Sequence, residues 1–179
     1  GSMVVWKDTY NGIFRANTVL ANIEVPTDYN QDLKNKHEGE AKFLRAYFYF
    51  DLVRIFGGVP AVTNIIEVDE SREVGRTSED EIYELVVNDL NDAIAKLPDT
   101  SEQGRVSKAA AIALLGKVKV YEEKWEDAKT LLERFFADYD YELLTDFNDL
   151  FRVETEVNTE SIFSLAYVEG TNGHGLTYA

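Results

Sequence analysis

His37 and His174 are the only side chains in this sequence whose ordinary pKa lies near neutrality, and such groups are the usual general bases and metal ligands. The run His37-Glu38-Gly39-Glu40 does not match the two-histidine zinc helix, where the ligands are four residues apart. We interpret His37 as a solvated helix residue. His174 lies between glycines, where it could hydrogen-bond a ligand. The sequence has no cysteine, which excludes thiolate metal sites and cysteine nucleophiles.

Carboxylates are abundant, with 33 aspartates and glutamates against 18 lysines and arginines. The number of carboxylates alone does not exclude a pair of catalytic carboxyl groups of the kind that glycosidases use. A buried catalytic pair would interrupt the apolar stripe of a helix, and only Asp51 and Asp89 stand near the edge of such a stripe. We interpret these two as partners of basic residues such as Arg45, Arg54 or Arg105. The sequence therefore predicts no catalytic residue, no cofactor, no metal ligand and a protein that is not an enzyme.

The net charge of −15 limits the partners of the chain. An acidic surface repels phosphate backbones and anionic lipid headgroups, which argues against nucleic acid and against peripheral membrane binding. No apolar run approaches the roughly 20 residues of a membrane-spanning helix, and no signal peptide is visible. Gly1-Ser2 is typical of a pair left by tag cleavage, so we expect that a natural targeting segment was removed.

Apolar residues recur with the period of an α-helix over five stretches. The most apolar of them follows a cap at Asp28 or Asn30 and ends where Gly57-Gly58 and Pro60 turn the chain out of the helix. Its apolar stripe is wide, so this helix is expected to be buried on more than one side. The connection 59–77 is expected to be a loop, with at most a short strand. The expected helices span about residues 4–23, 31–56, 79–97, 108–121 and 125–137.

The stretch 107–137 is the best candidate for a tetratricopeptide unit, a pair of antiparallel helices. Leu115-Gly116 matches the Leu-Gly pair of the first helix of that repeat, and Trp125 and Ala128 match the aromatic and small positions of the second. The match is partial, because the tyrosine usually found three residues after the glycine is Lys119 here. One unit cannot bury its own apolar face, so the earlier helices are expected to stack on it.

The expected fold class is therefore all-α: a right-handed tetratricopeptide-like array of antiparallel helix pairs, in a single domain over residues 1–179. Near the C-terminus the pattern changes. Residues 162–168 alternate between apolar and polar faces, which predicts a short strand, and residues 170–175 predict a flexible loop. A lone strand followed by an open loop suggests a truncated protein.

The stretch from Gly39 to Pro60 begins Gly-Glu-Ala-Lys-Phe-Leu-Arg-Ala-Tyr and ends Phe-Gly-Gly-Val-Pro. With this block as its most specific part, the sequence resembles the SusD/RagB family, which are surface glycan-binding lipoproteins of Bacteroidetes-type bacteria. Further blocks resemble the family in the same order, and they begin at Trp6, Arg76, Gly104 and Asn158.

The resemblance implies a scaffold of degenerate tetratricopeptide units and non-catalytic capture of oligosaccharides, or in some members peptides. It also implies a partner, a SusC-like TonB-dependent transporter on which the protein sits as a lid. The implied location is the outer membrane, as an outward-facing lipoprotein held only through a lipid anchor. The lipid-bearing N-terminal cysteine of the family is absent here, and the family is considerably longer at its C-terminal end.

No ligand-binding residue of the family can be assigned to this chain by matching a motif. Much of the ligand-contacting surface of the family comes from its longer C-terminal part and from loops before the first helix. Candidate ligand-binding residues are therefore chosen by exposure, polarity and loop position. They are Trp6, Asn172, His174 and Tyr178. For Trp6, core packing on the first helix is the stronger interpretation.

Three functions are compatible with these observations. The leading hypothesis is a glycan-binding subunit of an outer-membrane uptake complex. The alternative is a tetratricopeptide-type scaffold for protein–protein interaction without a sugar site, and the third is a fragment of a glycoside hydrolase. Oligosaccharide binding separates the first two, and turnover of a labelled glycan would identify the third.

Overall fold

The computed structural model describes residues 2–155 and 158–164, and the regular secondary structure in this part of the chain consists of helices, without strands. Its order is α1 (Ser2–Asn22), α2 (Gln31–Phe56), α3 (Val68–Ser71), α4 (Glu79–Lys96), α5 (Lys108–Tyr121) and α6 (Trp125–Asp138), then the 3-10 helices η1 (Phe147–Phe151) and η2 (Val153–Thr155). None of the helices described here has the length and apolarity needed to cross a membrane.

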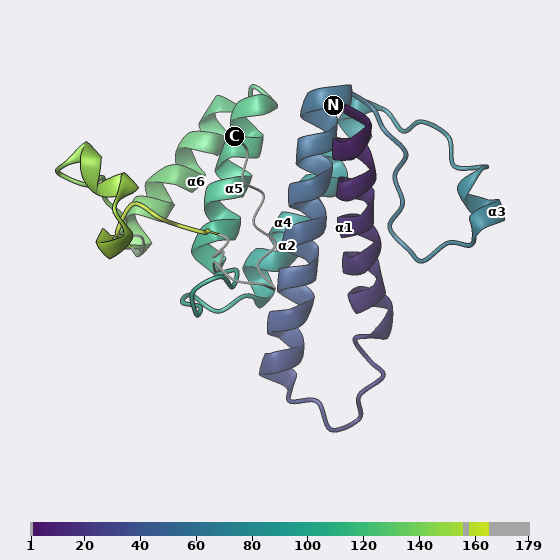
Figure 1. Ribbon diagram of the computed structural model, residues 1–179, viewed down its shortest axis with the longest axis horizontal. Helices are drawn as coiled ribbons and strands as arrows, with labels where there is room; N and C mark the ends of the chain where they lie inside the picture. Colours follow the sequence, from purple (N-terminus) through teal and green to yellow (C-terminus); the bar gives the residue numbers. More distant parts are fainter. Residues whose placement is uncertain (1, 156–157, 165–179) are drawn as a thin grey trace.

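The long helices form an array in which each packs on its neighbours in chain order (Figure 1): α1 on α2, α2 on α4, α4 on α5 and α5 on α6. The short helix α3 stands apart, on the connection that leaves α2. The predicted all-α, tetratricopeptide-like array of antiparallel helix pairs is confirmed. The boundaries of the tetratricopeptide unit at 107–137 and of a single domain over 1–179 stay predictions.

Helix α2 is the centre of the core, as its wide apolar stripe predicts. Ala46, Tyr49 and Leu52 are fully buried, because α1 covers one side of the helix and α4 another. The N-cap Asn30 accepts hydrogen bonds from the backbone of the first turn, and Gly57 ends the helix with a φ of 69°. Both ends of α2 therefore follow from local sequence signals.

Two glycines allow neighbouring elements to approach closely. A Cβ atom on Gly39 would stand 2.9 Å from the Leu97 side chain, and one on Gly116 would stand 2.9 Å from the Leu132 side chain. The second contact lies between α5 and α6, at the glycine that matches the tetratricopeptide pattern. Small residues at these positions let the helices pack at short range.

A buried polar network joins α1, α2 and α4. The Arg45 guanidinium donates to both carboxylate oxygens of Asp89, at 2.7 and 2.8 Å, and to the Asn17 side-chain oxygen at 2.8 Å. Asn17 in turn donates to the backbone carbonyls of Val62 and Asn64, which satisfies a polar side chain on the apolar face of α1. The predicted ion pairs of Asp89 and of Asp51, which pairs with Arg54, are both confirmed.

The connection 57–78 starts as an anchored segment. Donors on α1 and α2 hold its backbone: Tyr10 donates to Pro60 O, Asn17 to Val62 O and Asn64 O, Tyr49 to Val62 O, and Arg45 to Thr63 O. Its far end returns at Thr77, whose N–H donates to Val59 O at 3.1 Å. Between these anchors the chain forms α3, where the loop was expected to hold at most a short strand. A single turn is too short to show a helical period, so the sequence could not reveal α3.

The strand predicted over 162–168 is not seen at Ile162–Ser164, the described part of that range, where the chain bends; residues 165–168 and the loop at 170–175 lie outside the described residues. Ile162 and Phe163 are partly buried against the helical core, and the Phe163 ring meets Phe43 edge-on with centroids 5.6 Å apart. The alternation therefore reflects packing of these side chains on helices, without a neighbouring strand in the described residues to complete a backbone ladder.

The turn between α5 and α6 contains a strained residue, Glu123, with a φ of 58°. The Glu123 N–H donates to Val120 O and the Lys124 N–H donates to Lys119 O, which is the Schellman pattern with glutamate at the position usually taken by glycine. Glu123→Gly is therefore expected to raise the free energy of unfolding by about 1 kcal/mol, because glycine has no Cβ to strain there.

Urea denaturation of the wild type, Glu123→Gly and Glu123→Ala measures this effect. Alanine removes the charge but keeps the Cβ, so it should give no such gain. An equal gain from both variants would assign the effect to charge and contradict the backbone explanation.

Candidate functional site

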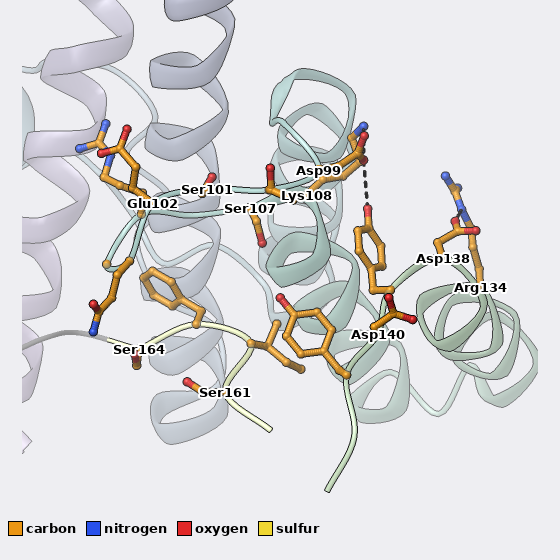
Figure 2. Close-up of a pocket in the computed structure, with 18 residues that line it drawn as sticks. Asp99, Ser101, Glu102, Ser107, Lys108, Arg134, Asp138, Asp140, Ser161 and Ser164 are labelled. Carbon is orange, nitrogen blue, oxygen red and sulfur yellow. Dashed lines mark hydrogen bonds and ion pairs between the residues drawn. The ribbon is translucent and has the colours of Figure 1, made fainter. Parts of the chain in front are cut away.

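A pocket of about 810 Å³ lies where three separate segments meet at one end of the helices (Figure 2). The first is the loop between α4 and α5 with the start of α5, residues 99–105 and 107–108. The second is the end of α6 and the chain after it, with Arg134 and residues 138–141. The third is the segment 161–164. Residues up to 65 positions apart in sequence thus line one concavity.

The α4–α5 loop is fixed by its own hydrogen bonds. Ser101 Oγ donates to Val106 O at 2.7 Å, and the Lys108 N–H donates to Pro98 O at 2.9 Å. Ser107 caps α5 by accepting from the Ala110 N–H, as its position before the alanine-rich run predicts. This wall of the pocket is therefore held at both ends by neighbouring helices.

The opposite wall consists of two chain segments tied to each other. The Glu142 N–H donates to Thr159 O at 3.2 Å, and the Leu144 N–H donates to the Glu160 carboxylate at 3.1 Å. Asn158 closes the turn into the last segment by accepting from the Ser161 N–H. These bonds place the residues after α6 beside Ser161.

Aromatic rings supply the apolar surface of the pocket. Tyr141 stacks on the buried Phe135 ring of α6, with centroids 5.2 Å apart and an interplanar angle of 18°. Tyr139 tilts against the same ring at 5.7 Å. Both tyrosines are half-buried and line the pocket together with Phe163. Phe135 thus orients two rings whose hydroxyl-bearing edges remain available to polar partners.

Most charged groups of the pocket are paired. Asp99 accepts from Lys108 Nζ at 2.9 Å and from the Tyr139 hydroxyl at 3.2 Å (dashed line in Figure 2). The Lys108 hydrogen bond holds the pKa of Asp99 below its ordinary value. Burial, together with the Asp99 charge, raises the pKa of Tyr139. The Asp99 carboxylate is therefore ionised and the Tyr139 phenol neutral at physiological pH.

Aromatic faces beside hydroxyl and carboxylate groups suit the recognition of a polyhydroxy ligand. The C–H faces of a sugar ring are apolar and pack on aromatic rings, while its hydroxyls need donors and acceptors at the rim. Ser101, Ser161 and Ser164 lie at that rim (Figure 2). In the part of the chain that the structure describes, no three histidine, aspartate or glutamate side chains are grouped to hold a metal ion.

Of the four predicted ligand-binding residues, the structure describes Trp6, which does not line the pocket. Trp6 is half-buried on α1, and its ring centroid lies 4.9 Å from that of Tyr10 and 5.1 Å from that of Phe56. It therefore packs on the core, which was the stronger interpretation of this residue from the sequence. Asn172, His174 and Tyr178 lie outside the described residues, and their role as ligand contacts stays a prediction. His37 is partly buried and hydrogen-bonds the Tyr29 hydroxyl through Nδ1.

Sequence reasoning missed the residues that line the pocket. The run Tyr139-Asp140-Tyr141 is the signal that could have pointed to them, because it places two aromatic rings and a carboxylate just after a helix. That these residues lie near Asp99 and Ser161 follows only from the tertiary structure.

Comparisons with known proteins agree on one family. The sequence pattern of a SusD-like family, described as "Starch-binding associating with outer membrane", matches residues 2–120. A SusD-like protein of Formosa agariphila, P25, is 31% identical over 94% of this chain, and one of Bacteroides ovatus is 27% identical over 91%. The chain spans about a third of the length of these relatives, 32% in each case.

Solved structures give the same result. A laminarin-binding SusD-like protein matches 89% of this chain and 36% of its own, with a TM-score of 0.84 and 36% identity. A SusD-like carbohydrate-binding protein of Bacteroides fragilis matches 92% of this chain and 33% of its own, with a TM-score of 0.85 and 30% identity.

Proposed function

Because this chain belongs to the SusD-like family, we propose that the protein captures oligosaccharides without converting them and delivers them to a SusC-like TonB-dependent transporter. The family description places its members at the outer membrane, and we propose the same location here, as an outward-facing lipoprotein. The leading hypothesis from the sequence is kept in full by this proposal.

The observation that carries the proposal is the pair of tyrosine rings, Tyr139 and Tyr141, in a pocket of about 810 Å³ with hydroxyl and carboxylate groups around them. A pocket of this size accommodates a short stretch of sugar units, since ligand pockets commonly span about 300–1,000 Å³. The similarity to a laminarin-binding protein and to a carbohydrate-binding protein supports the same class of ligand.

Tyr139→Ala is expected to weaken oligosaccharide binding about fivefold, because one aromatic contact is worth roughly 1 kcal/mol. Isothermal titration with neutral glucan oligosaccharides measures this effect. Tyr139→Phe keeps the ring and removes the hydroxyl, so it should retain the stacking contribution and lose only the hydrogen bond to Asp99. Tyr47→Ala is the matched control, because Tyr47 is an exposed tyrosine of α2 that does not line the pocket.

Three results would count against this proposal. Equal weakening by Tyr139→Ala and Tyr47→Ala would place the sugar outside the pocket. Transporter binding by a folded protein that binds no oligosaccharide would favour the tetratricopeptide-type scaffold. Turnover of a labelled glycan that disappears on replacing one carboxylate would favour the hydrolase.

A further inference from the structure

Every basic side chain that lines the pocket already has an acidic partner. Lys108 Nζ lies 2.9 Å from Asp99, and Arg134 Nε lies 3.2 Å from Asp138. Arg105 Nη2 lies 2.5 Å from the carboxylate of Glu40, a buried residue of α2. Each of these three positive charges is therefore offset by an acidic partner, and none stands in the pocket lining as an unpaired cation.

Within the described part of the chain, two acidic side chains of the pocket lack a close basic partner. The Asp140 carboxylate has no hydrogen-bond or ion-pair partner among the described residues, although it is exposed at the pocket rim (Figure 2). Glu102 has one distant partner, Lys36, at 4.0 Å. The lining therefore presents spare negative charge, within a chain whose net charge is −15.

Building on the proposed function, we propose that this pocket takes uncharged oligosaccharides and rejects those that carry uronate or sulfate groups. A carboxylate or sulfate is normally bound by a free arginine or lysine, which provides charge-assisted hydrogen bonds. Here such a group would meet only cations whose charge is already offset by Asp99, Asp138 or Glu40, and it would have to approach the unpaired Asp140. Hydroxyl groups meet no such repulsion, because they donate to the carboxylates and accept from the hydroxyls of Ser161 and Ser164.

Electrostatic selection of this kind is strongest at low ionic strength. Exposed charges are screened beyond about 8 Å at physiological salt, whereas carboxylates inside one pocket remain within that range of a bound ligand. Like charges placed together across an interface disfavour binding, so the discrimination is expected to reach about tenfold.

The test is a binding comparison on the full chain between two sets of oligosaccharides of matched length, neutral laminarin fragments and oligogalacturonates, at about 20 and about 500 mM salt. The neutral set is expected to bind about tenfold tighter at low salt, with a smaller ratio at high salt. Asp140→Lys is expected to shift the ratio toward the oligogalacturonates about fivefold or more, because it removes an anion and adds a free cation.

Asp8→Lys serves as the control. It makes the same change in net charge on α1, a helix that packs only on α2 among the described helices, so the ratio should not change. Binding of oligogalacturonates as tightly as laminarin fragments, or the same shift in both variants, would overturn this inference while leaving glycan capture intact. Binding of neither set, nor of any other oligosaccharide, would instead refute the proposed function itself.

Discussion

Replacing Asp89 with alanine is expected to lower the free energy of unfolding by about 3–5 kcal/mol, because it leaves the Arg45 guanidinium buried without its counterion. Arg45 is 8% exposed and Asp89 4% exposed, so water cannot readily replace the lost carboxylate. Two hydrogen bonds, at 2.7 and 2.8 Å, are lost together. The contacts of Arg45 with Asn17 and Thr63 O remain, but they do not neutralise its charge.

Urea denaturation followed by circular dichroism measures this loss. The matched control is Asp92→Ala, also on α4, which removes a half-exposed partner of Lys42 and should cost less than about 1 kcal/mol. A double replacement, Arg45→Met with Asp89→Leu, should recover most of the stability, because an apolar pair of similar volume leaves no buried charge. Equal losses for Asp89→Ala and Asp92→Ala would refute the role assigned to the network.

Gly58→Ala is expected to destabilise the protein by about 1–3 kcal/mol, because the new Cβ has no space and the obstacle is backbone. An alanine Cβ would stand 2.3 Å from Thr77 O and 3.3 Å from Glu79 N. Relief requires the two ends of the 57–78 connection to separate, which would also strain the hydrogen bond between Thr77 and Val59.

Thermal unfolding gives the stability change, and limited proteolysis reports whether the connection opens. Gly75→Ala is the control on the same connection, because a Cβ there meets no atom within 4 Å. It should leave stability unchanged or raise it by up to about 1 kcal/mol through a stiffer unfolded chain. Full stability and unchanged proteolysis of Gly58→Ala would show that the close approach to Thr77 is not required.

Local signals made much of the fold predictable. The capping box at Ser78 and Glu81 is present, Asn30 and Ser107 cap their helices, and Gly57 ends α2. It was also predictable that Asp89 and Asn17 would have polar partners inside the protein, because a polar group on an apolar stripe must form its hydrogen bonds there. Such inferences depend only on neighbours in sequence or on the helical period.

The pocket could not be predicted because it depends on long-range convergence. Asp99, Tyr139 and Ser161 come from three segments, and no periodicity relates the positions of these segments. The alternation after Asn158 was compatible with a strand, and only the tertiary structure shows that Phe163 packs on Phe43 of α2. Choosing ligand residues by exposure favoured loops near the C-terminus, whereas Tyr139 and Tyr141 of the pocket are half-buried.

The way in which α1 and α2 hold the segment 60–64 has a consequence for its evolution. The hydrogen bonds that Tyr10, Asn17, Arg45 and Tyr49 donate to this segment all end on main-chain carbonyls. The side chains of Thr63 and Asn64 are exposed. A carbonyl is the same whichever residue carries it, so mutations at these two positions leave the anchor intact. Selection can therefore diversify the surface of this segment while the donors on the helices stay constant.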